Sequence, residues 1–172
     1  MTAGNFNPRA RAAGVLAAVA GRNAQEGLAF YRAVAKHVSD PDVRALFLEL
    51  AADEQRHMHD LEQMEARGQT NLPSRDGSLL ANYIQGIVDT EVLRPVSELG
   101  PVTGTIHGLV QAIGYGIRAE TRAIELYSRA RDEAGSTAAA EGFRRLLDME
   151  QRHLALLTEL RDRLTTEPPP DD

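Results

Sequence analysis

Apolar residues recur every three or four positions along most of the chain, which predicts amphipathic helices rather than strands. The ranges 42–66 and 137–164 each carry such an apolar stripe, with charged residues on the other positions. The ranges 8–37 and 105–133 follow the same period, and 78–93 carries a shorter apolar pattern. The pattern therefore predicts an all-α protein with four long helices, and a shorter helix between the second and the third.

Breaker residues place the ends of these helices. The run Ser39-Asp40-Pro41 predicts a stop and a restart, because it offers a capping side chain and a proline that fits the first turn of a helix. Gly68 predicts the end of the second long helix, and Gly135 with Ser136 predicts the turn before the last one. The chain is therefore expected to form two helical hairpins.

The length of 172 residues fits one domain with a core of its own. We expect a single domain over 1–172, with a helical bundle over about 9–164. The stretch from about 68 to 104 predicts a long crossover between the hairpins, and 165–172 predicts a mobile tail because it is polar and rich in proline. Two hairpins joined by one long crossover predict a four-helix bundle.

A tetrapeptide, Glu-Gln-Arg-His, occurs twice in the chain, at 54–57 and at 150–153. The same offset of 96 residues relates two tyrosines and two phenylalanines, Tyr31 to Tyr127 and Phe47 to Phe143. The chain is therefore built from two similar halves, and each half carries Glu-x-x-His. This spacing puts a carboxylate and an imidazole on one face of a helix, one turn apart.

Both Glu-x-x-His pairs lie inside an apolar stripe rather than on the solvated face. A buried carboxylate is costly unless it is paired or bound to a metal. Two such pairs that face each other make a site for two metal ions. Glu54, His57, Glu150 and His153 are therefore predicted metal ligands. The alternative is a metal-free core in which the histidines and glutamates satisfy one another by hydrogen bonds between helices.

Counting back from the hairpin turns predicts a further carboxylate. The position opposite Glu150 in its hairpin is Glu120, which we expect to be the fifth ligand, with an ordinary surface glutamate as the alternative. The position opposite Glu54 is Ala24, so one carboxylate is missing from the first half. Glu26 and Gln25 are close in sequence but face other directions. Asp89 and Glu91, in the predicted crossover, are the other candidates for that place.

Composition excludes several classes of function. The chain has no cysteine, which excludes disulfides, thiol nucleophiles, zinc–thiolate sites and iron–sulfur centres within these residues. The net charge of −6 gives no electrostatic reason to expect nucleic-acid binding. The apolar run 15–20 is too short to cross a membrane, and the polar start lacks the plan of a signal peptide. We therefore expect a cytoplasmic protein.

These residues resemble the rubrerythrin-like branch of the ferritin-like superfamily, in which each half is similar to Glu-x-x-Gly/Ala-x-x-aromatic-Tyr followed by Glu-x-x-His. The second half matches this pattern over 120–127 and 150–153. The first half matches over 24–31 and 54–57, except that alanine replaces the first glutamate. The resemblance covers roughly 12–162 and lacks the cysteine-bearing, rubredoxin-like domain of full rubrerythrins.

The resemblance implies a ferritin-like fold and a di-iron carboxylate site. Glu54 and Glu150 would bridge the two irons, His57 and His153 would each bind one, and Glu120 would bind the iron held by His153. It also implies an oxidoreductase that acts on peroxide or dioxygen, a homodimer, and an external electron-donor protein. The missing carboxylate favours an alternative, a non-catalytic metal-binding protein or a degenerate structural dimer. Iron storage in a large shell is a third possibility, but no sequence feature specifies a shell.

Two further expectations concern residues around this site. Tyr31 and Tyr127 are expected to be core tyrosines that donate hydrogen bonds to the buried carboxylates. Arg56 and Arg152 repeat with the tetrapeptide, and we expect them to point outward and form ion pairs at the surface.

Overall fold

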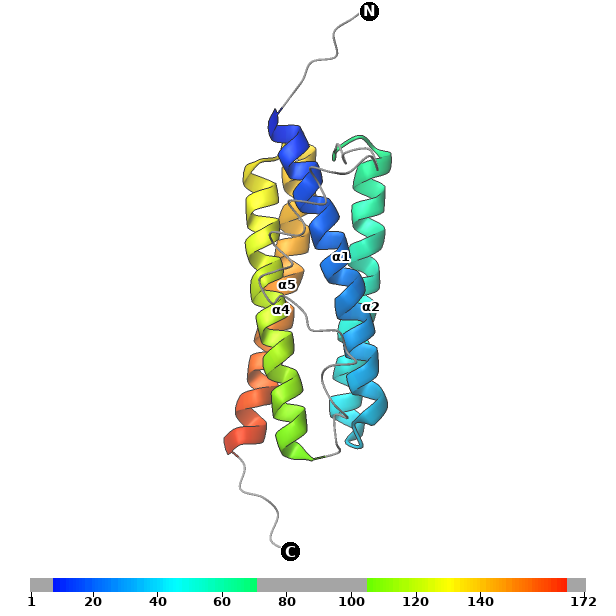
Figure 1. Ribbon diagram of the computed structural model, residues 1–172, viewed down its shortest axis with the longest axis vertical. Helices are drawn as coiled ribbons and strands as arrows, with labels where there is room; N and C mark the ends of the chain where they lie inside the picture. The colour runs from blue at the N-terminus through cyan, green and yellow to red at the C-terminus, as the bar shows by residue number, and fades with distance from the viewer. Residues whose placement is uncertain (1–7, 71–104, 167–172) are drawn as a thin grey trace, which may run out of the picture.

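The computed structural model describes residues 8–70 and 105–166, and within them every regular element is an α-helix. The helices are α1 (Pro8–His37), α2 (Pro41–Ala66), α4 (Ile106–Asp132) and α5 (Thr137–Thr166). They run side by side along the long axis of the molecule (Figure 1). The predicted all-α bundle is confirmed, while the predicted crossover helix at 78–93 lies outside the described residues.

The predicted helix boundaries agree closely with the structure. Asp40 caps α2, because its side chain accepts hydrogen bonds from the backbone N–H groups of Asp42 and Val43 at 2.9 and 3.0 Å. Beyond α2, Gly68 has a φ of 65°, in the left-handed region that favours glycine. Before α5, the Ser136 hydroxyl accepts from the backbone of Ala139 at 3.2 Å. The breaker residues therefore do set the hairpin ends.

The last helix is longer than predicted. α5 continues to Thr166, two residues past the expected end at 164. The hydroxyl of Thr165 donates to the carbonyl of Arg161 at 3.0 Å, and that of Thr166 donates to the carbonyl of Asp162. These bonds satisfy the hydroxyls of two threonines that would otherwise favour a non-helical end. The helix therefore extends two residues into the predicted tail, and the remainder of that tail lies outside the described residues.

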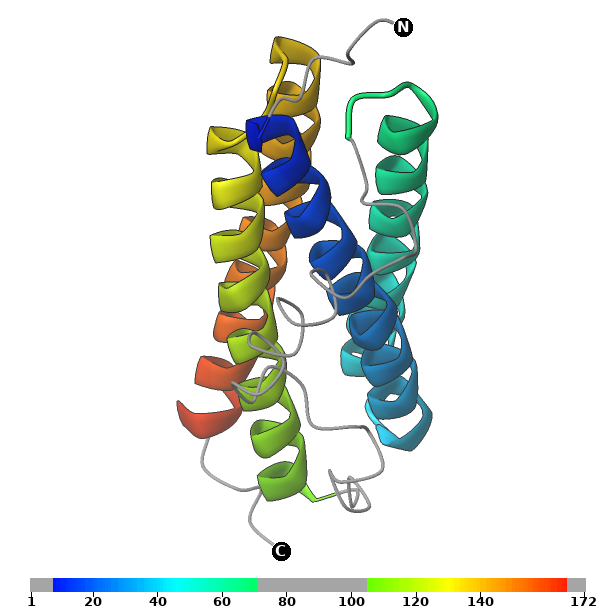
Figure 2. The same cartoon turned by 45° about the horizontal axis from the view of Figure 1, so that its top comes forward.

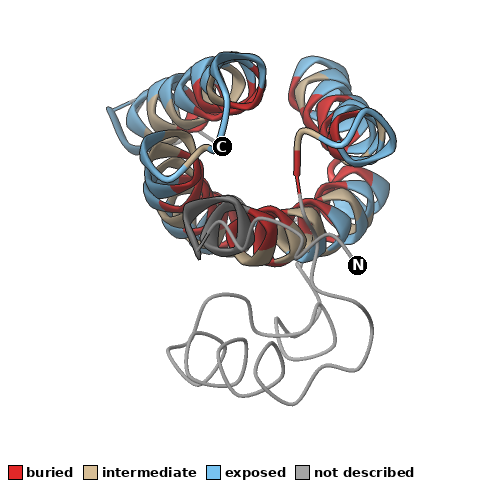
Figure 3. Ribbon diagram, turned by 90° about the horizontal axis from the view of Figure 1, so that it is seen from above, coloured by how far each residue is buried: buried red, intermediate tan, exposed pale blue. Residues whose placement is uncertain are grey.

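The packing of the helices follows the duplication. α1 packs on α2 as α4 packs on α5 (Figure 2). The two hairpins meet mainly through α1 with α4, and less extensively through α2 with α5. Viewed along the bundle, buried residues face its interior and exposed residues face outward (Figure 3). None of the described helices is long and apolar enough to span a membrane.

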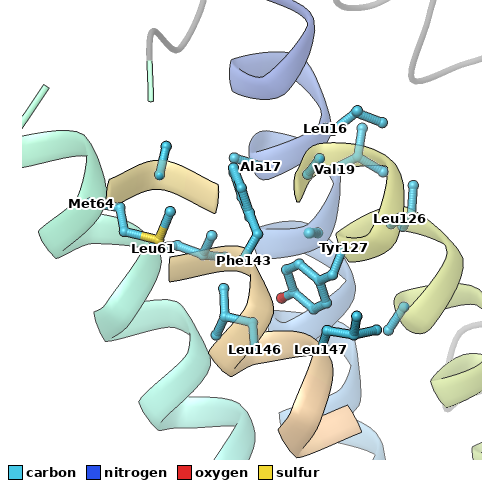
Figure 4. Close-up of a cluster of buried hydrophobic side chains, with 14 residues drawn as sticks. Leu16, Ala17, Val19, Leu61, Met64, Leu126, Tyr127, Phe143, Leu146 and Leu147 are labelled. Carbon is cyan, nitrogen blue, oxygen red and sulfur yellow. The ribbon is translucent and has the colours of Figure 1, made fainter. Parts of the chain in front are cut away.

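The core consists of two apolar clusters, one toward each end of the bundle. One cluster contains Tyr127 and Phe143 (Figure 4), and the other contains their counterparts Tyr31 and Phe47. Each cluster takes residues from all four helices. The buried polar residues at 53–57, 120 and 150–153 fall between the residues of the two clusters along their helices. The apolar clusters therefore enclose a polar centre in the middle of the bundle.

Candidate metal centre

All five predicted ligands are buried, and the structure brings them together from three helices. Each of these five residues is at most 3% exposed: Glu54 and His57 on α2, Glu120 on α4, and Glu150 and His153 on α5. One nitrogen or oxygen atom from each of Glu54, Glu120, Glu150 and His153 lies within 4.8 Å of the others. A second group, formed by His57, Glu150 and His153, meets the same criterion. Glu54 and Glu150 thus approach each other in the core, as the duplication predicts.

The two imidazole rings stack on each other with their Nδ1 atoms toward the carboxylates. The ring centroids of His57 and His153 are 5.3 Å apart, and the rings are inclined by 26°. Nδ1 of His57 lies 3.1 Å from Oε2 of Glu54 and 3.3 Å from Oε1 of Glu150. Nδ1 of His153 lies 3.3 Å from Oε2 of Glu150, 3.7 Å from Oε1 of Glu120 and 3.8 Å from Oε1 of Glu54. Both halves therefore contribute donors to one compact cluster.

Burial and mutual contact shift the pKa values of the cluster. Burial lowers the pKa of both imidazoles, but the neighbouring carboxylates outweigh it and raise the pKa of His57 and of His153 to about 9. Burial raises the pKa of Glu54, and it raises that of Glu120 well above its ordinary value. Burial also raises the pKa of Glu150, but the two histidines outweigh it and hold that pKa at about 2. Without a metal, the positive charge of the protonated imidazoles therefore compensates the negative charge of the carboxylates.

The residues present fit a divalent metal ion. Nδ1 of His153 and Oε2 of Glu150 are buried and have no hydrogen-bond partner among the described residues. Unpaired buried polar atoms are costly, and a cation next to both would satisfy them. The donor set of carboxylate oxygens and imidazole nitrogens suits iron or manganese, and the lack of thiolates disfavours soft metals. A metal would take the place of the protons that the imidazoles hold.

The two core tyrosines differ, although the duplication makes them equivalent. The hydroxyl of Tyr31, on α1, donates a hydrogen bond to Oε1 of Glu120, as predicted. The hydroxyl of Tyr127 is buried and has no hydrogen-bond partner in the described part of the chain, so this half of the prediction is wrong. Its hydroxyl points from α4 into the bundle (Figure 4). The 96-residue offset places its expected acceptor at Ala24, which has no side-chain oxygen.

The missing carboxylate is not supplied by a neighbour on α1. Ala24 is buried, whereas Glu26 pairs with Arg22 near the surface at 3.2 Å and Gln25 is exposed. The other candidates, at 89 and 91, lie outside the described residues. One turn beyond Ala24, a Cβ added to Gly27 would lie 3.1 Å from Cδ of Glu54. The carboxylate of Glu54 therefore lies against the backbone of α1, where glycine allows a close approach.

Asp53 is a buried residue of this centre that the sequence analysis missed. Its Oδ2 lies 3.0 Å from Nε2 of His153, on the side of the ring away from the cluster. The duplication hid it, because the equivalent position in the second half is Met149. The only signal in the sequence was an acidic residue next to Glu54 at the edge of an apolar stripe.

The repeated arginines also differ from the prediction. Both side chains are more than half exposed, as expected, but each pairs with the buried Asp53 rather than with a surface acid. Nη2 of Arg152 donates to Oδ2 of Asp53 at 2.9 Å, and Arg56 pairs with Oδ1. Asp53 is 1% exposed, so two guanidinium groups compensate the burial of its charge.

A four-helix bundle with buried carboxylates and histidines from facing helices defines the class of ferritin-like metal-binding proteins. The family model described as rubrerythrin matches residues 19–161, most of the chain, so this protein belongs to the rubrerythrin family. The family predicted from the sequence is thereby confirmed. No curated protein and no solved structure matches the chain.

Proposed function

We propose that this metal-binding, ferritin-like protein is an iron-dependent oxidoreductase that reduces peroxide or dioxygen. The observation that carries the proposal is the convergence of three glutamates and two histidines, all buried, in the middle of the bundle. When bound, two iron(II) ions would supply one electron each, which with two protons reduces hydrogen peroxide to two waters. The rubrerythrin family supports iron as the metal.

The geometry supports a division of roles among the five residues. Glu54 and Glu150 suit a bridging role, because each contacts Nδ1 of both imidazoles. His57 and His153 would each hold one metal through Nδ1. Glu120 would hold the metal on the side of His153, to which its Oε1 lies closest of the two imidazoles. The hydroxyl of Tyr31 fixes this glutamate by its hydrogen bond.

The apolar clusters would keep water away from the metal centre. The electrons would come from a partner protein. The two apolar clusters lie above and below the polar centre, and they lower the dielectric around it. No cysteine occurs in these 172 residues, so a rubredoxin-like centre would have to come from outside them. We propose a separate electron-donor protein for that step, and a homodimer as the working form.

Metal analysis is the direct test. The protein is purified without added iron, and its metal content is measured before and after anaerobic loading with iron(II). We expect up to two irons per chain, and oxidation of iron(II) when hydrogen peroxide is added, followed as an absorption band of carboxylate-bound iron(III). Failure to bind iron(II) would remove the basis of the proposal. Sedimentation or light scattering measures the oligomeric state separately.

A non-catalytic role is the second candidate, and a specific observation favours it. Ala24 takes the place of one carboxylate, and the hydroxyl of Tyr127 has no acceptor in the part of the chain that the structure describes. A protein that binds iron or zinc but neither consumes peroxide nor turns over with an artificial reductant would fit a metal carrier. A protein that binds no metal and forms a stable dimer would fit a structural role.

A further inference from the structure

Three pairs of positions related by the 96-residue offset differ between the halves of the centre. Glu120 corresponds to Ala24, and Asp53 corresponds to Met149. Tyr31 has a carboxylate acceptor, whereas Tyr127 has none among the described residues. Each difference removes a polar interaction from one of the two halves.

The half around His153 keeps every supporting interaction. Its Nδ1 faces three carboxylates, those of Glu150, Glu120 and Glu54, within 3.8 Å. On the other side of the ring, Asp53 lies 3.0 Å from Nε2. A carboxylate only accepts hydrogen bonds, so Nε2 carries the hydrogen and Nδ1 is left to bind a metal. Asp53 therefore fixes both the orientation and the tautomer of this ring.

The half around His57 has lost the same interactions. Within the described residues, its Nδ1 has two carboxylates within 4 Å, those of Glu54 and Glu150. Its Nε2 is buried and has no hydrogen-bond partner within the described ranges. Met149, which takes the place of the aspartate, has no oxygen to accept that hydrogen bond. All three losses therefore fall on one half, and none falls on the other.

We infer that the two halves of the centre bind metal unequally: the His153 half, positioned by Asp53, binds one divalent ion first and tightly, and the His57 half binds a second ion weakly. The inference rests on the proposed metal binding and adds an order of loading. It also assigns a role to Asp53, a positioning residue that acts through His153 rather than by touching the metal. Outer partners of this kind change metal affinity by about 10- to 100-fold.

Titration with cobalt(II) under anaerobic conditions tests the inference, because its visible absorption reports ligand number and calorimetry reports affinity. The wild-type chain should bind one cobalt(II) tightly and a second at least about tenfold more weakly. His153→Ala should abolish the tight step, whereas His57→Ala should keep one tightly bound cobalt(II) per chain and lose the weak step. The two variants remove the same side chain from equivalent positions, so each is the control for the other.

Asp53 is tested with its own counterpart. Asp53→Ala should weaken the tight step by about 10- to 100-fold and change the cobalt(II) spectrum. Asp53→Asn keeps an oxygen that can accept the hydrogen bond from Nε2, so it should lose less metal affinity than Asp53→Ala. A merely structural role of Asp53 would not produce this rescue of affinity. Met149→Ala, at the equivalent position, should leave the tight step unchanged. Melting of the metal-free variants shows whether each is folded.

The outcomes separate this inference from the proposed function. Binding of two cobalt(II) ions with equal affinity would contradict the inference that the halves bind metal unequally. Equal losses of bound cobalt(II) in the two histidine variants would contradict it too. Neither result would contradict the proposed metal binding itself. A chain that binds no cobalt(II) or iron(II) at all would overturn both.

Discussion

The hydroxyl of Tyr31, on α1, donates a hydrogen bond to the carboxylate of Glu120, on α4, so the first half of the chain holds a ligand that the second half provides. The pKa of Tyr31 is raised well above its ordinary value by burial and by the neighbouring Glu120 carboxylate, so the hydroxyl keeps its proton and remains a donor. The equivalent hydroxyl of Tyr127 has no acceptor in the described residues. This contrast allows a matched pair of variants.

Tyr31→Phe should destabilise the metal-free protein by about 1–3 kcal/mol, because it removes the hydrogen bond that the tyrosine hydroxyl donates to the buried carboxylate of Glu120. Tyr127→Phe should be neutral or slightly stabilising, because the hydroxyl it removes is buried and has no partner among the residues that the structure describes. Urea unfolding of the two variants and the wild type measures both effects. Equal losses of stability in the two variants would contradict the difference between the two hydroxyls.

Ala24→Glu should restore the carboxylate that the duplication predicts. With metal present, the variant should bind the second iron or cobalt more tightly and raise the stoichiometry toward two per chain. Without metal, a carboxylate at this buried position should lower the melting temperature, since a buried charge without a metal or a cationic partner is costly. Metal analysis measures the stoichiometry, and the melting temperature with and without metal measures the effect on stability. Lower stability with unchanged metal content would favour the structural role.

Metal should stabilise the fold by mass action, because the ligands converge only in the folded chain. At a free metal concentration 100 times the dissociation constant, the free energy of unfolding should rise by about 2.7 kcal/mol. Thermal unfolding with iron(II) or cobalt(II), followed by addition of a chelator, measures this effect. The double variant lacking both imidazoles, His57→Ala with His153→Ala, should show no such rise.

The metal-free protein should become less stable as the pH rises from about 6.5 to about 9. The imidazoles of His57 and His153 have an ordinary pKa of 6.5 and a folded-state pKa of about 9, so the protons bound in the folded state stabilise it. That stabilisation is complete below 6.5 and is lost as the pH passes 9. The raised pKa values of Glu54 and Glu120 act in the same direction. Urea unfolding across this range should show a steady decline; an increase would contradict the described contacts.

The fold and four of the five candidate ligands could be predicted because the duplication repeats them. Two copies of Glu-x-x-His at one offset fix two helix faces, and the hairpin turns then fix the height of Glu120. The capping chemistry of Asp40 and the left-handed conformation of Gly68 are local, so the helix ends could be placed within one or two residues.

What the sequence analysis missed are interactions that the duplication does not repeat. Asp53 reaches an imidazole on another helix and has methionine as its counterpart, so comparing the halves concealed it. The arginines at 56 and 152 do repeat, but only the packed helices show that both reach the same buried acid. Likewise, only the structure shows that the hydroxyl of Tyr127 has no hydrogen-bond partner over 8–70 and 105–166.

The support of His153 comes from the opposite hairpin, since Asp53 belongs to α2 and Tyr31 to α1, whereas the ring and Glu120 belong to α5 and α4. An isolated α4–α5 hairpin would keep Glu120, Glu150 and His153 but would lack both groups that orient them. Docking of the hairpins and assembly of the tight half are therefore one event, in which a bound ion would act as a cross-link between two separately formed pieces of chain. Release of that ion would then be governed by how often the hairpins part, rather than by ligand exchange alone.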